Sequence, residues 1–123
     1  IRTHYFYPQA SATVVCHASI ATNDEITLIS TDGTSLKYVA KTSNSFTDRH
    51  FKQNDSSGDG EAINTATNLK AAIEHASGHN GKLVVSQDSA TLTITQAEPG
   101  PDGNTSITED LTSATVSSAF TGG

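Results

Sequence analysis

The chain has 123 residues, a formal net charge of −6 at pH 7 and a hydrophobic fraction of 34%, which suit one domain with a modest core. Its 7 Lys and Arg residues are scattered, so no basic stripe follows a phosphate backbone and nucleic acid is not an expected partner. No apolar run approaches the length of a membrane-spanning helix, so no membrane association is expected.

Ser and Thr together supply 33 residues, which favours Thr-rich strands with neutral polar faces. Cys16 is the only cysteine, and this excludes an intrachain disulfide. The sequence contains no Met, so we expect that the chain was processed, cut from a longer product or lacks its start.

The first ten residues are interpreted as an N-terminal arm, residues 1–10, followed by a single domain, residues 11–123. Three consecutive aromatic residues, Tyr5 to Tyr7, precede Pro8, and neighbours on an extended segment point to opposite faces. A strand that merely precedes a sheet cannot bury all three rings. We therefore predict that the arm pairs with a neighbouring copy through its assembly residues, which are His4, Tyr5, Phe6 and Tyr7.

Residues 11–19 are predicted to form a strand, with Val14 and Cys16 on one face and Val15 and His17 on the other. A free cysteine among β-branched residues is typically buried, and we expect this of Cys16. Because strand neighbours point to opposite faces, Cys16 and His17 do not form a catalytic thiolate–imidazole pair.

The clearest local signal is a β-hairpin over residues 25–40, in which two β-rich runs flank Asp32-Gly33. A two-residue Asp-Gly loop favours a type I′ turn. The register that follows pairs Thr31 with Thr34, Ile29 with Leu36 and Thr27 with Tyr38. In the polar stretch that comes next, Phe46 and Phe51 are expected to hold a loop or short strand on the core.

The stretch DSSGDGE resembles the first half of a calcium-binding loop, with weak candidate ligands at Asp55, Ser57, Asp59 and Glu61. The twelfth position would be Ala66, which lacks the bidentate carboxylate, so we predict a solvated acidic turn without a cofactor and keep calcium as the alternative. Two glycosylation sequons begin at Asn54 and Asn104, and these are the candidate glycan acceptors.

One segment has helical periodicity: Ala66, Leu69, Ile73 and Ala76 share one face of a helix predicted over about residues 65–77. Asn64 or Thr65 is expected to cap its start, and Gly78 to end it in a left-handed conformation. His75 and His79 are interpreted as solvated residues near the helix end, and a metal site there is the alternative.

A second hairpin is predicted from residues 82–87 and 91–96, with Leu92 and Ile94 on its dry face. A turn cluster at residues 98–104, a short run around Ile107 and a last strand over residues 114–120 follow. The sequence thus predicts an α+β domain of mostly antiparallel, β-sandwich-like sheets, with about seven strands and one helix packed on a sheet.

The hairpin, the helix and the C-terminal turns resemble β-rich modules found in structural proteins of environmental bacteriophages. The similar segments are DEITLISTDGTSLKY, AINTATNLKAAIEHASGHNGKLVVS, LTITQAEPGPDGNTSIT and the closing FTGG. The resemblance covers about two-thirds of the chain, excludes the aromatic arm and carries no active-site residues. It implies a role in virion or fibre architecture, and an extracellular filament is equally compatible.

No signature of the strongly marked enzyme classes occurs, so we predict that the chain is not an enzyme. The predicted function is a structural subunit of a virion appendage or extracellular filament that assembles with identical copies. The alternative is an adhesin or carbohydrate-binding module, with calcium and with Tyr5, Tyr7 or Tyr38 as a stacking platform for a glycan.

Overall fold

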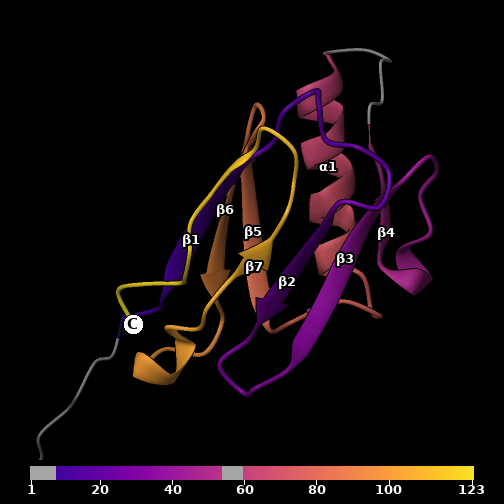
Figure 1. The fold of residues 1–123 in the computed structure, drawn as a ribbon. Coiled ribbons are helices and arrows are strands. Elements are labelled where there is room, and N and C mark those ends of the chain that lie inside the picture. Colours follow the sequence, from indigo (N-terminus) through magenta and orange to yellow (C-terminus); the bar gives the residue numbers. More distant parts are fainter. Residues whose placement is uncertain (1–7, 54–59) are drawn as a thin grey trace, which may run out of the picture.

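The computed structural model describes residues 8–53 and 60–123, and these ranges contain eight strands, one α-helix and two short 3-10 helices (Figure 1). The elements in chain order are β1 (Ser11–Val15), β2 (Glu25–Ile29), β3 (Ser35–Lys41), η1 (Phe46–Asp48), β4 (His50–Lys52), α1 (Glu61–Glu74), β5 (Leu83–Asp88), β6 (Thr91–Gln96), η2 (Pro101–Gly103), β7 (Thr108–Glu109) and β8 (Thr115–Val116).

The strands form two sheets of four, in the orders β5-β6-β1-β8 and β4-β3-β2-β7. All pairs are antiparallel except β3 with β4. Next to β7 and β8, the chain segments pair with each other through the Ser106–Ala119 bridge, which joins the two sheets on that side. On the other side α1 packs between β4 and β5 (Figure 1). The predicted α+β class, mostly antiparallel with one helix, is confirmed.

The helical face that the periodicity predicted to be apolar is buried, and Ala66, Leu69 and Ile73 are fully enclosed. The predicted bounds and caps were wrong: the helix runs over Glu61–Glu74, and Gly60 precedes it without a side-chain cap. Thr65, one of the expected caps, is buried inside the helix instead. The other, Asn64, is also helical, and its N–H donates to the Gly60 carbonyl at 3.0 Å. Ala76 lies beyond the helix and is exposed.

The helix ends at Glu74, because His75 is extended (φ −68°, ψ 155°), so the predicted end at a left-handed Gly78 was wrong. The φ of Gly78 is not positive, and a Cβ placed there would lie 2.4 Å from the Ala72 carbonyl oxygen and 2.8 Å from that of Ile73. This narrow approach lets the His79 N–H donate to the Ile73 carbonyl at 2.8 Å. The turn after the helix therefore requires the absence of a side chain at Gly78, and not a left-handed backbone.

The first hairpin forms, but the predicted register was wrong by one residue. Ile26 lies opposite Tyr38 and Leu28 opposite Leu36, so apolar side chains meet across the pair. The loop has three residues, closed by the Ser30 N–H donating to the Thr34 carbonyl at 3.0 Å, with Gly33 at a φ of 86°. Such a loop with a left-handed third residue replaces the expected type I′ turn.

The second hairpin has the predicted faces, since Leu92 and Ile94 of β6 are fully buried. Gln96 continues this face by alternation, and its buried amide connects the two sheets. Its Oε1 accepts from the Thr31 N–H at 3.0 Å, and its Nε2 donates to the Ile29 carbonyl at 2.9 Å and the Gly103 carbonyl at 3.2 Å. A polar side chain therefore fixes the distance between the sheets at this end.

Candidate assembly site

The predicted arm, residues 1–10, is attached to the domain from Pro8 onward. The Pro8 carbonyl accepts from the Gly100 N–H at 3.0 Å, and the Ala10 carbonyl accepts from the Gln96 N–H at 2.8 Å. These bonds extend the pairing of β1 beside β6. The assembly residues His4, Tyr5, Phe6 and Tyr7 lie outside the described part of the chain.

The C-terminus lies beside this exit point (Figure 1). Thr121 and Ser11 exchange main-chain hydrogen bonds of 3.0 and 2.9 Å, and a Cβ at Gly123 would lie 3.0 Å from that of Ala10. The Gly123 N–H also donates to Asn104 Oδ1 at 2.9 Å. Chain segments entering and leaving the domain therefore meet at one end of the molecule.

The outer edge of β4 is closed by neighbouring groups. His50 and Ser45 exchange two main-chain hydrogen bonds, of 2.9 and 3.1 Å. The Lys52 N–H donates to Asn44 Oδ1 at 2.6 Å, and its carbonyl accepts from Asn68 Nδ2 at 3.1 Å. At the other end of the two sheets β7 and β8 have only two residues each, and the segments next to them pair with each other. These edges offer little to an additional strand.

The outer edge of β5 is different, because its outward-facing main-chain groups are unpaired. Lys82 pairs with Ala97, so alternation turns the main-chain groups of Val85 and Gln87 away from β6. Among the described residues, none of these four groups, the N–H and the carbonyl of Val85 and of Gln87, has a hydrogen-bond partner. We name these groups the β5 edge.

The side chains next to the β5 edge do not protect it. Val84 is 56% exposed, more than any other large hydrophobic residue of the described ranges. The strand reads LVVSQD and contains neither Lys nor Pro, the residues with which edge strands commonly resist pairing. On its inner side the Gln87 amide donates to Thr67 Oγ1 of α1 at 2.9 Å, so the helix lies alongside.

Of the predicted calcium ligands, Asp55, Ser57 and Asp59 lie outside the described residues, and Glu61 is the first residue of α1. Within the described ranges no group of three or more His, Cys, Asp or Glu side chains could hold a metal ion. The glycan candidate Asn54 also lies outside them. Asn104 is exposed, and its Nδ2 donates to the Gly123 carbonyl at 3.3 Å.

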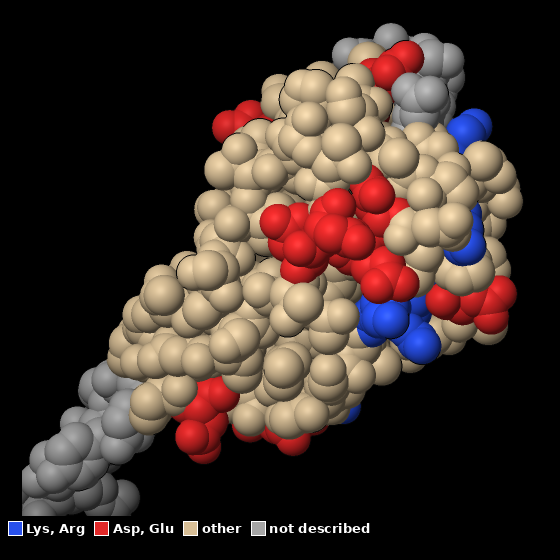
Figure 2. Space-filling view, in the orientation of Figure 1, with Lys and Arg blue, Asp and Glu red and all other residues tan. Residues whose placement is uncertain are grey.

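Acidic side chains gather near the middle of one face (Figure 2). Glu25, Glu109 and Asp110 line a hollow of about 110 Å³ there, smaller than the roughly 300 to 1,000 Å³ of typical ligand pockets. Burial raises the pKa of the nearby Asp24 carboxyl group, but hydrogen bonds lower it by more. The carboxylate accepts these bonds from the Ala21 and Thr112 N–H groups and the Thr112 hydroxyl, and they keep its pKa below the usual range. Its Oδ2 thus connects the β1–β2 turn to the turn before β8.

The clearest polar network that the sequence did not reveal joins Tyr38, His79 and Thr34. The Tyr38 hydroxyl lies 2.7 Å from His79 Nδ1, and His79 Nε2 lies 2.9 Å from the Thr34 carbonyl. Because a carbonyl only accepts, Nε2 carries the proton and Nδ1 accepts from the tyrosine. Both side chains are fully buried, so the expectations of a solvated His79 and of a glycan platform at Tyr38 were wrong.

The pKa of His79 is lowered mainly by burial, which disfavours the imidazolium. The hydrogen bond to the Thr34 carbonyl and the charge of Asp32 oppose this effect, whereas the charges of Lys82 and Arg49 add to it. The neutral form is therefore the one that the fold accommodates.

We expect the melting temperature to fall as the pH is lowered from 7 to 5. The folded-state pKa of His79 lies below the value of about 6.5 expected for the unfolded chain, so the unfolded state binds the proton more readily. The free energy of unfolding therefore decreases as the pH falls below about 6.5. Each kcal/mol lost lowers the midpoint by about 4 °C in a domain of this size. His79→Gln should flatten this dependence; identical slopes in both proteins would contradict the assignment.

Cys16 is buried as predicted, and desolvation raises the pKa of its thiol to about 12. His17 points to the exposed face, and its Nδ1 accepts from the Ser19 N–H at 3.0 Å. A buried, protonated thiol is a poor nucleophile and a poor metal ligand.

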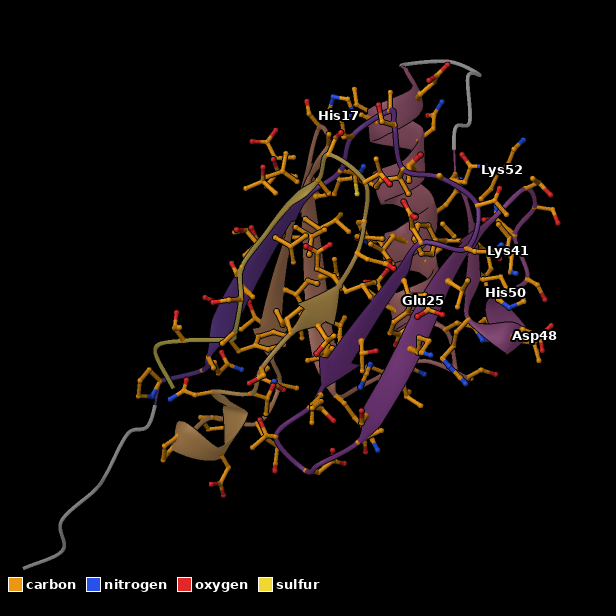
Figure 3. All side chains as sticks on the ribbon, viewed as in Figure 1. His17, Glu25, Lys41, Asp48, His50 and Lys52 are labelled. Carbon is orange, nitrogen blue, oxygen red and sulfur yellow. The ribbon has the colours of Figure 1, made fainter. Side chains whose placement is uncertain are left out.

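Other ionisable side chains do not converge on one cleft (Figure 3). Lys41, Asp48, His50 and Lys52 follow the side of the molecule near β4, while His17 and Glu25 lie elsewhere.

No helix in the described ranges is long and apolar enough to cross a membrane. Neither a protein-family model nor a curated protein nor a solved structure matches this chain, so the resemblance to bacteriophage modules stays a prediction.

Proposed function

We propose that this protein is a structural, non-enzymatic subunit that assembles with identical copies into a virion appendage or an extracellular filament. The observation that supports this function best is the β5 edge, where Val85 and Gln87 leave four main-chain groups unpaired. An unprotected sheet edge is a template for pairing with another chain. The aromatic segment before Pro8 supplies a chain suited to that pairing.

Each copy has one terminal segment to give and one sheet edge to receive. A contact between two different surfaces of the same subunit is heterologous, and it produces an open filament unless the rotation between copies closes a ring. The first described residues lie beside the C-terminus at one end of the domain, and this position is compatible with such stacking.

The energetics favour a reversible contact that depends on subunit concentration. Burying two or three aromatic rings contributes on the order of 10 kcal/mol. Association costs of roughly 4 to 15 kcal/mol oppose this gain, so main-chain hydrogen bonds and lateral contacts decide the outcome. Neutral Ser and Thr side chains, 33 in all, allow close lateral packing because few charges need to be desolvated.

The function is tested by electron microscopy of the purified protein over a range of concentrations. We expect filaments or rings above a threshold concentration and monomers below it. Particles that remain monomeric at all concentrations, and that bind glycans in calorimetry, would instead support an adhesin or carbohydrate-binding module.

A further inference from the structure

We infer that the β5 edge is the surface that receives the arm of a second copy, with Tyr5 to Tyr7 of the donor lying beside Val85 and Gln87 of the acceptor. This inference rests on the proposed function and makes it specific. It follows from comparing the strand edges: β4 is capped by Asn44, Ser45 and Asn68, and β7 and β8 have two residues each. Among these four outer strands of the described ranges, β5 alone has two alternate residues, Val85 and Gln87, whose outward main-chain groups all lack a partner.

The geometry favours a second copy over the molecule's own arm. Pro8 continues β1, and the strand order β5-β6-β1 places β6 between this exit and the β5 edge. That edge is two strand spacings away, roughly 10 Å, and Val85 lies opposite Ile94, farther along the sheet from Gln96. Tyr5 to Tyr7 lie within three residues of Pro8, which is at most about 10 Å of extended chain. They therefore cannot align with their own β5 edge.

The two sides of the β5 edge offer different surfaces to the docked strand. On the outer side Val84 is exposed, and on the inner side α1 lies alongside through the contact between Gln87 and Thr67. In an extended arm Phe6 points opposite to Tyr5 and Tyr7. One set of rings therefore packs against Val84 and the other against α1, and aromatic side chains opposite a β-branched residue are a favourable cross-strand pair.

The first test places a charge on the β5 edge with Val84→Lys, and uses Val15→Lys as the matched control. Val84 and Val15 are the two exposed large hydrophobic residues of the described ranges, and Val15 belongs to β1, which has strands on both sides. We expect Val84→Lys to raise the assembly threshold by about tenfold or more, equivalent to about 1.4 kcal/mol per contact. The control should assemble like the wild type, and both variants should keep the wild-type melting temperature within a few degrees.

The second test is intermolecular cross-linking with introduced thiols. Val84→Cys is mixed with Tyr5→Cys or with Phe6→Cys, since one of these two side chains faces Val84. The native Cys16 is buried and does not compete. A disulfide-linked dimer with one of the two arm variants supports the inference, and Val15→Cys should give none.

The outcomes separate the inference from the function on which it rests. If the wild type assembles but Val84→Lys assembles equally well and no cross-link forms, the arm docks elsewhere and the β5 edge is not its acceptor. If the wild type never assembles and the mixed thiol variants never cross-link, both proposals are overturned.

Discussion

Leu69→Asp is expected to leave the protein unfolded at 25 °C. Leu69 is fully buried in the face of α1 that packs between β4 and β5. The substitution removes its apolar contacts and places an unpaired carboxylate in the core, at a cost of about 5 kcal/mol or more. This is comparable with the whole stability of a small domain, roughly 5 to 15 kcal/mol.

Thr67→Asp is the matched control, because Thr67 is exposed on the same helix and a carboxylate can accept the hydrogen bond that its hydroxyl accepts from the Gln87 amide. Its new carboxylate stays in water and lies in the first half of the helix, where negative charge is tolerated. Far-ultraviolet circular dichroism should show a cooperative melt for the control and none for Leu69→Asp. A cooperative melt of Leu69→Asp at the wild-type midpoint would mean that α1 is not part of the core.

Several elements were predictable because one local pattern determined each of them. The recurrence of Ala66, Leu69 and Ile73 identified the helix and its buried face. The alternation of Leu92 and Ile94 identified the buried face of the second hairpin. The β-rich run around Cys16 indicated that this cysteine is buried. Each signal depends only on periodicity within one segment, which tertiary packing did not override.

Two of the wrong predictions, the hairpin register and the solvated His79, concern interactions between segments. Asp32-Gly33 suits both a two-residue and a three-residue loop, and the choice was made by the meeting of Leu28 with Leu36 across the hairpin. A one-residue change of register exchanges the faces of a strand, so the buried side decides it. The burial of His79 likewise depends on Tyr38, which is 41 residues away along the chain.

For the proposed contact, the sequence offers a candidate only on the donor side. The run of Tyr5 to Tyr7 before Pro8 indicated an arm from composition alone. The acceptor depends on strand order, because β5 is an edge strand only when β6 pairs with β1 on its other side. No periodicity within residues 83–88 distinguishes an edge strand from a central one.

The structure also refines where the arm should be cut. Pro8 to Ala10 pair with the domain, and the Pro8 carbonyl accepts from the Gly100 N–H at 3.0 Å. A deletion that removed Pro8 would disturb this contact as well as the arm. Deleting Ile1 to Tyr7 keeps every hydrogen bond described above.

The most direct test of arm-mediated assembly is therefore sedimentation and electron microscopy of the Ile1 to Tyr7 deletion beside the wild type. We expect the deleted protein to have an unchanged melting temperature and to remain monomeric at concentrations where the wild type forms filaments, because the donor side of the contact is gone. Filaments of the deleted protein with the same appearance and the same threshold concentration would contradict the account.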